Sequence, residues 1–457
     1  MRRVRAVIAI LVAASAAVQP FVKYEAPALA LTHVRVIDGT GAAPREDQTL
    51  CISGGKIAAS CPASAQQLDM TGKTVMPGLV GMHDHLFYPM GGAIFSEMAR
   101  SFPRLYLAAG VTTIRTAGSV EPYTDLELKK NIDKGLEAGP KIFITGPYLE
   151  GEGSFALQMH AIKDPEDARA TVRFWAGQGA TSFKAYNTLT RAELGAAIDE
   201  AHKLKLKVTG HLCSIGFSEA ARLGIDDLEH GIVVDTEFFS GKKLDACPDT
   251  RGAYEELSKM SPDDPRIAAL IKELVDRHVA LTSTLAVFDA ITEAGWKRAL
   301  TPAVLDALSP DTRNRLLSAH AGGRDPAMWT PIVKLEMEFE HRFAKAGGLL
   351  IAGCDPTGNG TTLAGYGDWR DVELLVEAGF TPLEALKIHS LNGAQWLGAQ
   401  DRIGSIAPGK DADLVVVAGD PSKNIADLEK VEVVFKDGIG YDPQKLAASV
   451  RGLVGDR

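Results

Sequence analysis

From Thr74 onward, short runs of apolar and β-branched residues alternate with longer segments of helical periodicity, and this alternation limits the possible folds most strongly. The intervening segments, such as 165–179 and 191–205, repeat apolar residues every three or four positions and predict helices. Strand–helix alternation is typical of a parallel sheet covered by helices, and eight strands favour an α/β fold of the TIM-like (β/α)8 barrel type. A doubly wound open sheet has the same periodicity and stays as an alternative. The eight predicted strands are Val75–His83, Val111–Thr116, Lys141–Thr145, Thr181–Ala185, Leu206–His211, Asp227–His230, Val279–Thr284 and Leu349–Cys354.

The two ends of the chain have a different texture, with short strands joined by glycine turns. "ALTHVRVIDGTG" and "QTLCISGGKIAAS" lie near the N-terminus, and "DLVVVAGDP" and "VEVVFKDG" lie near the C-terminus. A simple explanation is a small β-sandwich built from both terminal segments. We therefore expect residues 18–74 and 399–457 to form this sandwich and residues 75–398 to form the barrel.

The first 17 residues resemble an export signal. "MRRVR" is a basic start, "AVIAILVAASAAV" is an apolar stretch that is short for a bilayer span, and "AASAA" offers a cleavage site near Ala17. We expect cleavage there and a periplasmic or secreted protein with no membrane attachment afterwards. The alternative is a retained membrane anchor.

Composition and charge restrict the class of partner. With 46% hydrophobic and 23% charged residues, the chain has the composition of a globular protein. A formal charge of −9 and the absence of basic runs beyond the N-terminus argue against nucleic acid as a partner, so we expect a small-molecule substrate. The sequence leaves the oligomeric state open, a homo-oligomer included.

The five cysteines leave at least one thiol unpaired in an exported protein. Cys51 and Cys61 flank the predicted hairpin turn "SGGK", where they could form a disulfide or remain thiols. Cys354 lies in an apolar run, and we expect it to be a buried thiol.

Chemically active residues recur at the carboxyl ends of the predicted strands. Barrel enzymes carry their chemistry at these ends, so side chains far apart in sequence would meet there. Histidines two residues apart on a strand project from one face, whereas the residue between them, Asp84, points away and is expected to be structural. The residues at the strand ends are His83, His85, Lys184, His211, His230 and Asp355.

Together, the motifs "PGLVGMHDH", "FKAY", "TGHL", "LEHG", "AGCD" and "GSIAPGKDADLVVV" resemble the amidohydrolase superfamily over residues 31–440. The lysine on the fourth strand resembles the binuclear metal-dependent subtype, including its prolidase-like and Xaa-arginine carboxypeptidase-like branches. The resemblance implies a distorted barrel with a β-sandwich formed from both termini.

The resemblance also implies a role for each of the six residues. His83, His85 and Asp355 would hold the more buried metal, His211 and His230 the more exposed one, and N-carboxylated Lys184 would bridge both. Imidazole and carboxylate ligands without thiolate favour zinc, with manganese, cobalt or iron as alternatives. A metal-bridged hydroxide would attack the substrate carbonyl, with Asp355 as general base and then general acid.

The branch resemblance implies a hydrolase that cleaves the amide bond of a dipeptide or an N-acyl amino acid. His160 and Tyr186 are candidate substrate contacts from the loops after the third and fourth strands, and Thr284 is expected to be structural. One alternative is hydrolysis of a cyclic amide, a lactone or an ester at the same metals. Another is a catalytically inactive binding protein with the amidohydrolase fold.

Overall fold

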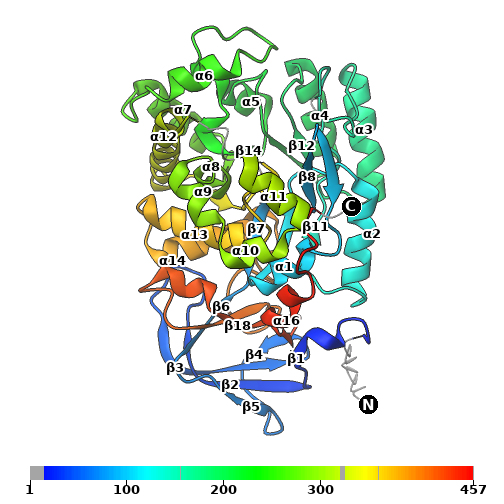
Figure 1. Cartoon of the computed structure of the whole chain (residues 1–457), viewed down its shortest axis with the longest axis vertical. Coiled ribbons are helices and arrows are strands. Elements are labelled where there is room, and N and C mark those ends of the chain that lie inside the picture. The colour runs from blue at the N-terminus through cyan, green and yellow to red at the C-terminus, as the bar shows by residue number, and fades with distance from the viewer. Residues whose placement is uncertain (1–14, 155, 320–324, 359, 456–457) are drawn as a thin grey trace, which may run out of the picture.

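The computed structural model describes residues 15–154, 156–319, 325–358 and 360–455 (Figure 1). Residues 1–14 of the predicted export signal lie outside this range. No helix within the described ranges has both the length and the apolar character needed to cross a membrane.

Nine strands from the two ends of the chain form one mixed sheet, at the bottom of Figure 1. Strands β6 and β17 join the N-terminal to the C-terminal segment as antiparallel neighbours, with Val75 opposite Val416. The sheet order is β1-β19-β18-β17-β6-β2-β3-β4, with β5 also paired to β2. Its strands are β1 (Val22–Tyr24), β2 (Ala28–Val36), β3 (Arg45–Ser53), β4 (Lys56–Ala58), β5 (Gln66–Asp69), β6 (Lys73–Pro77), β17 (Leu414–Ala418), β18 (Val431–Lys436) and β19 (Ile439–Tyr441).

Eight further strands are parallel and occur in the predicted order, but they form two sheets. One has the order β11-β10-β7 and the other β12-β13-β14-β15-β16. No continuous closed ladder is present among the described residues, so the structure shows the expected α/β arrangement but not a closed (β/α)8 barrel. The strands are β7 (Leu79–Asp84), β10 (Val111–Thr116), β11 (Lys141–Phe143), β12 (Ser182–Ala185), β13 (Lys207–Gly210), β14 (Asp227–Glu229), β15 (Ala280–Ser283) and β16 (Leu350–Ala352).

The two gaps between these sheets are spanned by isolated contacts. Parallel bridges join Thr145 to Ser182 and Leu149 to Ala185 between β11 and β12. At the other gap, the Asp355 amide donates to the His83 carbonyl at 2.9 Å. Because β11 and β16 are only three residues long, each gap holds a few bonds instead of a full ladder.

The predicted strand Val75–His83 is divided between the terminal sheet and the parallel strands. Strand β6 ends at Pro77 and β7 begins at Leu79, with Gly78 between them. A Cβ atom at Gly78 would lie 2.0 Å from the Thr112 hydroxyl, so only glycine fits this crossing. Both strands are almost entirely buried, and the apolar pattern therefore gives no sign of the change of sheet.

Helices pack around the parallel strands (Figure 1). Helices α3 and α4 lie where periodicity predicts them, and α4 begins with a capping box between Thr190 and Glu193. The strands β8 (Phe87–Gly91) and β9 (Ile94–Glu97) form a separate hairpin after β7. The α-helices are α1 (Phe102–Ala108), α2 (Pro122–Asp133), α3 (Pro165–Gln178), α4 (Arg191–Lys203), α5 (Phe217–Leu223), α6 (Thr250–Leu257), α7 (Pro265–Asp276), α8 (Leu285–Asp289), α9 (Glu293–Ala299), α10 (Pro302–Ala307), α11 (Pro310–Ala319), α12 (Pro326–Lys345), α13 (Tyr366–Glu377), α14 (Pro382–Lys387), α15 (Gly393–Trp396) and α16 (Pro443–Ala448).

The cysteines form two disulfides. Cys51 pairs with Cys61, which resolves the alternative that the sequence left open. Cys213 also pairs with Cys247, a bond between two loops that the sequence did not predict. Cys354 is a buried free thiol, as expected.

Candidate metal centre and active site

Six side chains predicted from the strand ends converge at one end of the parallel strands. His83 lies in β7 and His85 directly after it, while Lys184 lies in β12. The other three follow the ends of β13, β14 and β16, and all six line one cavity of about 520 Å³. Apart from His211, which is partly exposed, each of the six residues is buried.

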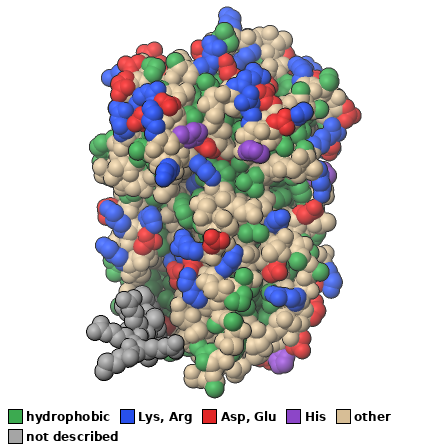
Figure 2. Space-filling model, turned by 180° about the vertical axis from the view of Figure 1, so that it is seen from behind, with side chains coloured by type: hydrophobic (Ala, Val, Ile, Leu, Met, Phe, Trp, Pro, Cys, Tyr) green, Lys and Arg blue, Asp and Glu red, His purple; other side chains and the backbone are tan. Residues whose placement is uncertain are grey.

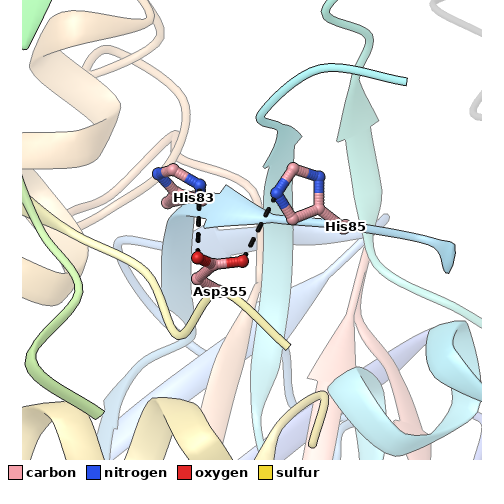
Figure 3. A group of neighbouring side chains, drawn as sticks. All are labelled: His83, His85 and Asp355. Carbon is pink, nitrogen blue, oxygen red and sulfur yellow. Dashed lines mark ion pairs between the residues drawn. The ribbon is translucent and has the colours of Figure 1, made fainter. Parts of the chain in front are cut away.

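His83, His85 and Asp355 form the tightest part of this cluster (Figure 3). The Nε2 atom of His83 lies 4.0 Å from Oδ2 of Asp355, and Nε2 of His85 lies 3.5 Å from Oδ1. Their potential ligand atoms all lie within 4.8 Å of one another. Asp355 has a positive φ of 45°, an unfavourable conformation for a non-glycine residue, of the kind that concentrates at functional sites.

The other three side chains surround this group. The Lys184 Nζ atom lies 2.9 Å from Nε2 of His83. The His230 ring lies between those of His83 and His211, with centroid distances of 4.4 and 4.5 Å. The six predicted ligands therefore form one continuous cluster.

Hydrogen bonds set the tautomers of the first two histidines. The Nδ1 atom of His83 lies 2.6 Å from Oε2 of Glu229, and Nδ1 of His85 lies 3.2 Å from the Gly118 carbonyl. An ionised carboxylate and a carbonyl only accept hydrogen bonds, so each Nδ1 carries the proton. The Nε2 lone pair of His85 then faces the Asp355 carboxylate, whereas that of His83 faces both Asp355 and the Lys184 ammonium.

This arrangement fits a cation. Lone pairs of His83 and His85 directed at a carboxylate repel it unless a positive charge lies between them. Imidazole nitrogen and carboxylate oxygen are suitable ligands for zinc and related divalent metals. The chemistry of the donor set therefore fits a metal centre.

Burial keeps the four imidazoles neutral. It lowers the pKa of His83, His85 and His230 well below the usual value and that of His211 to about 3. For His83, His85 and His211, the nearby Lys184 ammonium is the next largest cause. Neutral imidazole is the form that binds metal.

Burial also changes the proton affinities of Lys184 and Asp355. It lowers the pKa of Lys184 to about 8, although Glu229 and Asp355 oppose the change. It raises the pKa of Asp355, against the opposing charge of Lys184. The lysine is thus more easily neutralised, and the aspartate is a stronger base, than either would be in water.

A buried ionic network supports the histidines, and sequence patterns did not identify it. Arg115 is fully buried in β10 and donates to Glu229 at 2.9 Å, while its other terminal nitrogen lies 3.3 Å from Asp227. Glu229 in turn orients His83. A charged residue within the predicted β-branched strand "VTTIRT" is the one signal that could have identified Arg115.

Of the two residues expected to be structural, one contacts the candidate site and the other does not. Thr284 contacts the site, because its hydroxyl lies 2.7 Å from Nδ1 of His230. Asp84 points away from the cavity as expected, and its carboxylate accepts a hydrogen bond from the Cys354 amide.

Of the two candidate substrate residues, one lines the cavity and the other does not. Tyr186 lines the cavity, with its ring centroid 4.7 Å from that of His211. His160 does not line it; its side chain is 51% exposed and pairs with Asp167 at 3.0 Å. The neighbouring Met159 faces the cavity, so the loop reaches the site while His160 turns towards the start of α3. The structure therefore does not support the expected role of His160.

Comparison with known proteins gives consistent matches. The model of the Amidohydrolase family matches residues 74–279 and 344–439, about two-thirds of the chain. Imidazolonepropionase from Streptomyces avermitilis is 25% identical over 387 residues, which are 81% of this chain and 80% of that protein.

Solved structures share the fold. A putative prolidase from Bifidobacterium longum matches with a TM-score of 0.68 and 27% identity, over 92% of this chain and 95% of that one. A Xaa-Pro dipeptidase with bound methionine in its active site matches with a TM-score of 0.67 and 20% identity, over 91% and 100%. At 20% identity, the second likeness shows the fold alone.

Proposed function

The chain belongs to the amidohydrolase family and is a hydrolase acting on carbon–nitrogen bonds, and we propose that it uses two divalent metals to cleave a dipeptide or an N-acyl amino acid. The observation that carries the proposal is the convergence of four neutral imidazoles, Lys184 and Asp355 in one cavity. The similarity to a prolidase favours a peptide-like amide.

Each metal would have its own histidine ligands. His83, His85 and Asp355 would hold one ion, and His211 and His230 the other. Zinc is the ion that this donor set favours. Divalent ions at such a site lower the pKa of water towards neutrality and polarise a substrate carbonyl. The two separated sheets together would supply the strand ends of a distorted (β/α)8 barrel.

Lys184 would bridge the ions as an N-carboxylate. Because burial lowers its pKa to about 8, Lys184 loses its proton far more readily near neutral pH than an ordinary lysine does. The neutral amine can add carbon dioxide and release a proton, and the resulting carboxylate supplies the oxygen ligands that a bridge needs.

Asp355 would move the proton. Its raised pKa suits a group that first accepts a proton from the attacking water and then delivers it to the leaving nitrogen. Thr357 donates to Asp355 Oδ1 at 2.8 Å and would hold the carboxylate in position.

A cyclic amide is the second candidate substrate. The relative from Streptomyces avermitilis is named for an imidazolone, which is a ring. A lactone or an ester could use the same site. All six ligand positions are filled, so an inactive binding protein has less support.

Substitution of Lys184 tests the proposed bridge. In zinc-supplied protein, Lys184→Ala should lower kcat/KM at least a thousandfold and reduce the metal content below two ions per chain. A short carboxylate such as propionate should restore part of the activity, because it can occupy the place of the carboxylated lysine. Wild-type turnover of Lys184→Ala on dipeptides would refute the assigned role.

A substrate panel tests the bond that is cleaved. Dipeptides, N-acyl amino acids, cyclic imides and lactones would be compared with the same preparation. Cleavage confined to the cyclic substrates would replace the peptide assignment with the second candidate.

We also propose that the protein is exported and works in the periplasm or outside the cell. The basic and apolar N-terminus supports this, and so do two disulfides, which persist in oxidising compartments. N-terminal sequencing of the mature protein should begin near Val18. A mature chain that starts at Met1 would contradict the proposal.

A further inference from the structure

The cavity above the six polar residues is bounded by two aromatic walls. The first wall consists of Phe87, Phe95, Tyr148 and Tyr186, and the second of Tyr254, Phe288 and Trp329. Nothing in the proposed chemistry requires these side chains, so they bear on which molecule the site accepts.

The first wall lies beside His85. Phe87 and Phe95 come from the β8–β9 hairpin, with ring centroids 5.4 Å apart. Tyr148 and Tyr186 follow β11 and β12, and their ring centroids lie 4.9 Å apart. The His85 ring lies 4.7 Å from Phe87, so this wall begins directly at the proposed metal ligands.

The second wall lies beside His230 and comes from three helices. Phe288 of α8 lies 5.6 Å from the His230 ring and is stacked on Trp329 of α12, with 15° between the ring planes. The ring centroid of Tyr254, in α6, lies 4.8 Å from that of Trp329. Helix α12 packs against both α6 and α8, and these three helices lie at the upper left of Figure 1.

Charge is confined to the floor of the cavity. Among the described residues that line it, Lys184, Asp355 and the histidines are the only titratable groups apart from tyrosines. A carboxylate placed between the walls would lose its hydration and face electron-rich rings, and a cation would regain only part of its lost hydration from those ring faces. An apolar substituent instead gains free energy from burial.

We infer that the substrate carries a neutral aromatic or branched aliphatic group that occupies the space between the two walls, next to the bond that is cleaved. The inference rests on the proposed function for the identity of that bond. The walls themselves are a property of the cavity, so the binding of such a group can be measured without turnover.

A matched set of dipeptides tests the inference. Phe-Phe, Leu-Phe, Phe-Leu, Asp-Phe, Lys-Phe, Phe-Asp and Phe-Lys all contain the same kind of amide. The apolar members should have kcat/KM values about 100-fold above those with a charged side chain. Charged and apolar members within threefold of one another would overturn the inference.

A charge placed on the first wall should change this preference. Phe95→Arg, at a partly exposed position, should raise kcat/KM for Asp-Phe or Phe-Asp relative to Phe-Phe at least tenfold. The matched control is Phe174→Arg, which introduces the same charge at a half-exposed phenylalanine of α3 outside the cavity. An unchanged ratio in folded Phe95→Arg, or the same change in the control, would contradict the inference.

Binding measurements separate this inference from the proposed function. If no dipeptide is cleaved, the proposed function fails. N-acetyl-phenylalaninamide should still raise the Tm of the wild type, while the lysine and aspartate analogues should not, and Trp329→Ala should reduce the shift. Equal shifts with all three amides, or no shift with the aromatic one, would overturn the inference.

Discussion

At the scale of single residues, the position of one proton on His83 organises the centre. The Glu229 carboxylate accepts a hydrogen bond from the protonated Nδ1 atom of His83. The Nε2 atom of His83 is thereby directed at Lys184 and Asp355. Burial would raise the pKa of Glu229, but Arg115 and Lys184 outweigh it and lower the pKa, so the carboxylate stays charged. A charged acceptor behind a histidine makes it a better ligand.

Substitution of Glu229 should therefore weaken metal binding. Glu229→Gln keeps the size of the side chain but removes its charge, and we expect the affinity for zinc to fall about 10- to 100-fold. Titration with a competing chelator would measure the change. The matched control is Glu152→Gln at an exposed position, which should bind zinc like the wild type. Equal affinity in both variants would show that Glu229 does not orient His83.

At the scale of elements, Arg115 connects strands from the two separate sheets. It lies in β10 of the three-stranded sheet, donates to the Met82 carbonyl of β7, and pairs with Asp227 and Glu229 of β14. Strand β14 lies in the five-stranded sheet. One guanidinium with two carboxylates therefore links the three-stranded sheet to the five-stranded sheet.

Loss of Arg115 should be costly. Arg115→Met leaves two buried carboxylates without their cation, and the free energy of unfolding should fall by about 3–5 kcal/mol. Denaturant unfolding would measure it. The control is Arg222→Met, which removes an exposed arginine paired with Glu273 and should cost less than about 1 kcal/mol. Similar losses in both variants would mean that burial of the network is unimportant.

At the scale of the whole molecule, Lys141 ties the parallel strands to the terminal sheet. It belongs to β11 and lies 2.5 Å from Asp413, next to β17, and 2.7 Å from Asp437, between β18 and β19. Elsewhere on the surface, acidic and basic side chains are interspersed, as on the face in Figure 2. Lys141 therefore supplies a directed ionic contact between the two parts.

Acid should weaken this contact. Burial would raise the pKa of Asp437, but Lys436 and Lys141 outweigh it and lower the pKa from 3.8 to about 2. A lowered pKa stabilises the fold above the unfolded value, so the contribution is complete above about pH 4 and is lost as the pH falls towards 2. Because half of the side chain is exposed, we expect only about 1 kcal/mol.

Comparison with Asp437→Asn measures this contribution. The Tm of the wild type should fall more steeply between pH 4 and pH 2 than that of the variant, and the two curves should run parallel above pH 5. Parallel curves throughout would show that Asp437 does not contribute.

The sequence by itself determined the order of the eight strands and the six residues at their ends. Strand periodicity is local, and a residue that follows a buried strand is placed by its own segment, so His83 or Asp355 can be located without knowledge of the neighbours. Tyr186 could be placed at the cavity in the same way. The position of His160 could not be predicted in this way, because its loop lacks the regular periodicity that would fix which side chains face the cavity.

Only the tertiary structure decided which distant residues meet. The Arg115–Glu229 network and the Cys213–Cys247 bond join segments whose local sequences do not indicate their partners. The division of the parallel strands into two sheets was likewise not visible in the sequence. The second aromatic wall likewise combines Tyr254, Phe288 and Trp329 from three helices. Such contacts depend on the packing of whole elements, because the free energy of burial depends on shape and area and not on position in the sequence.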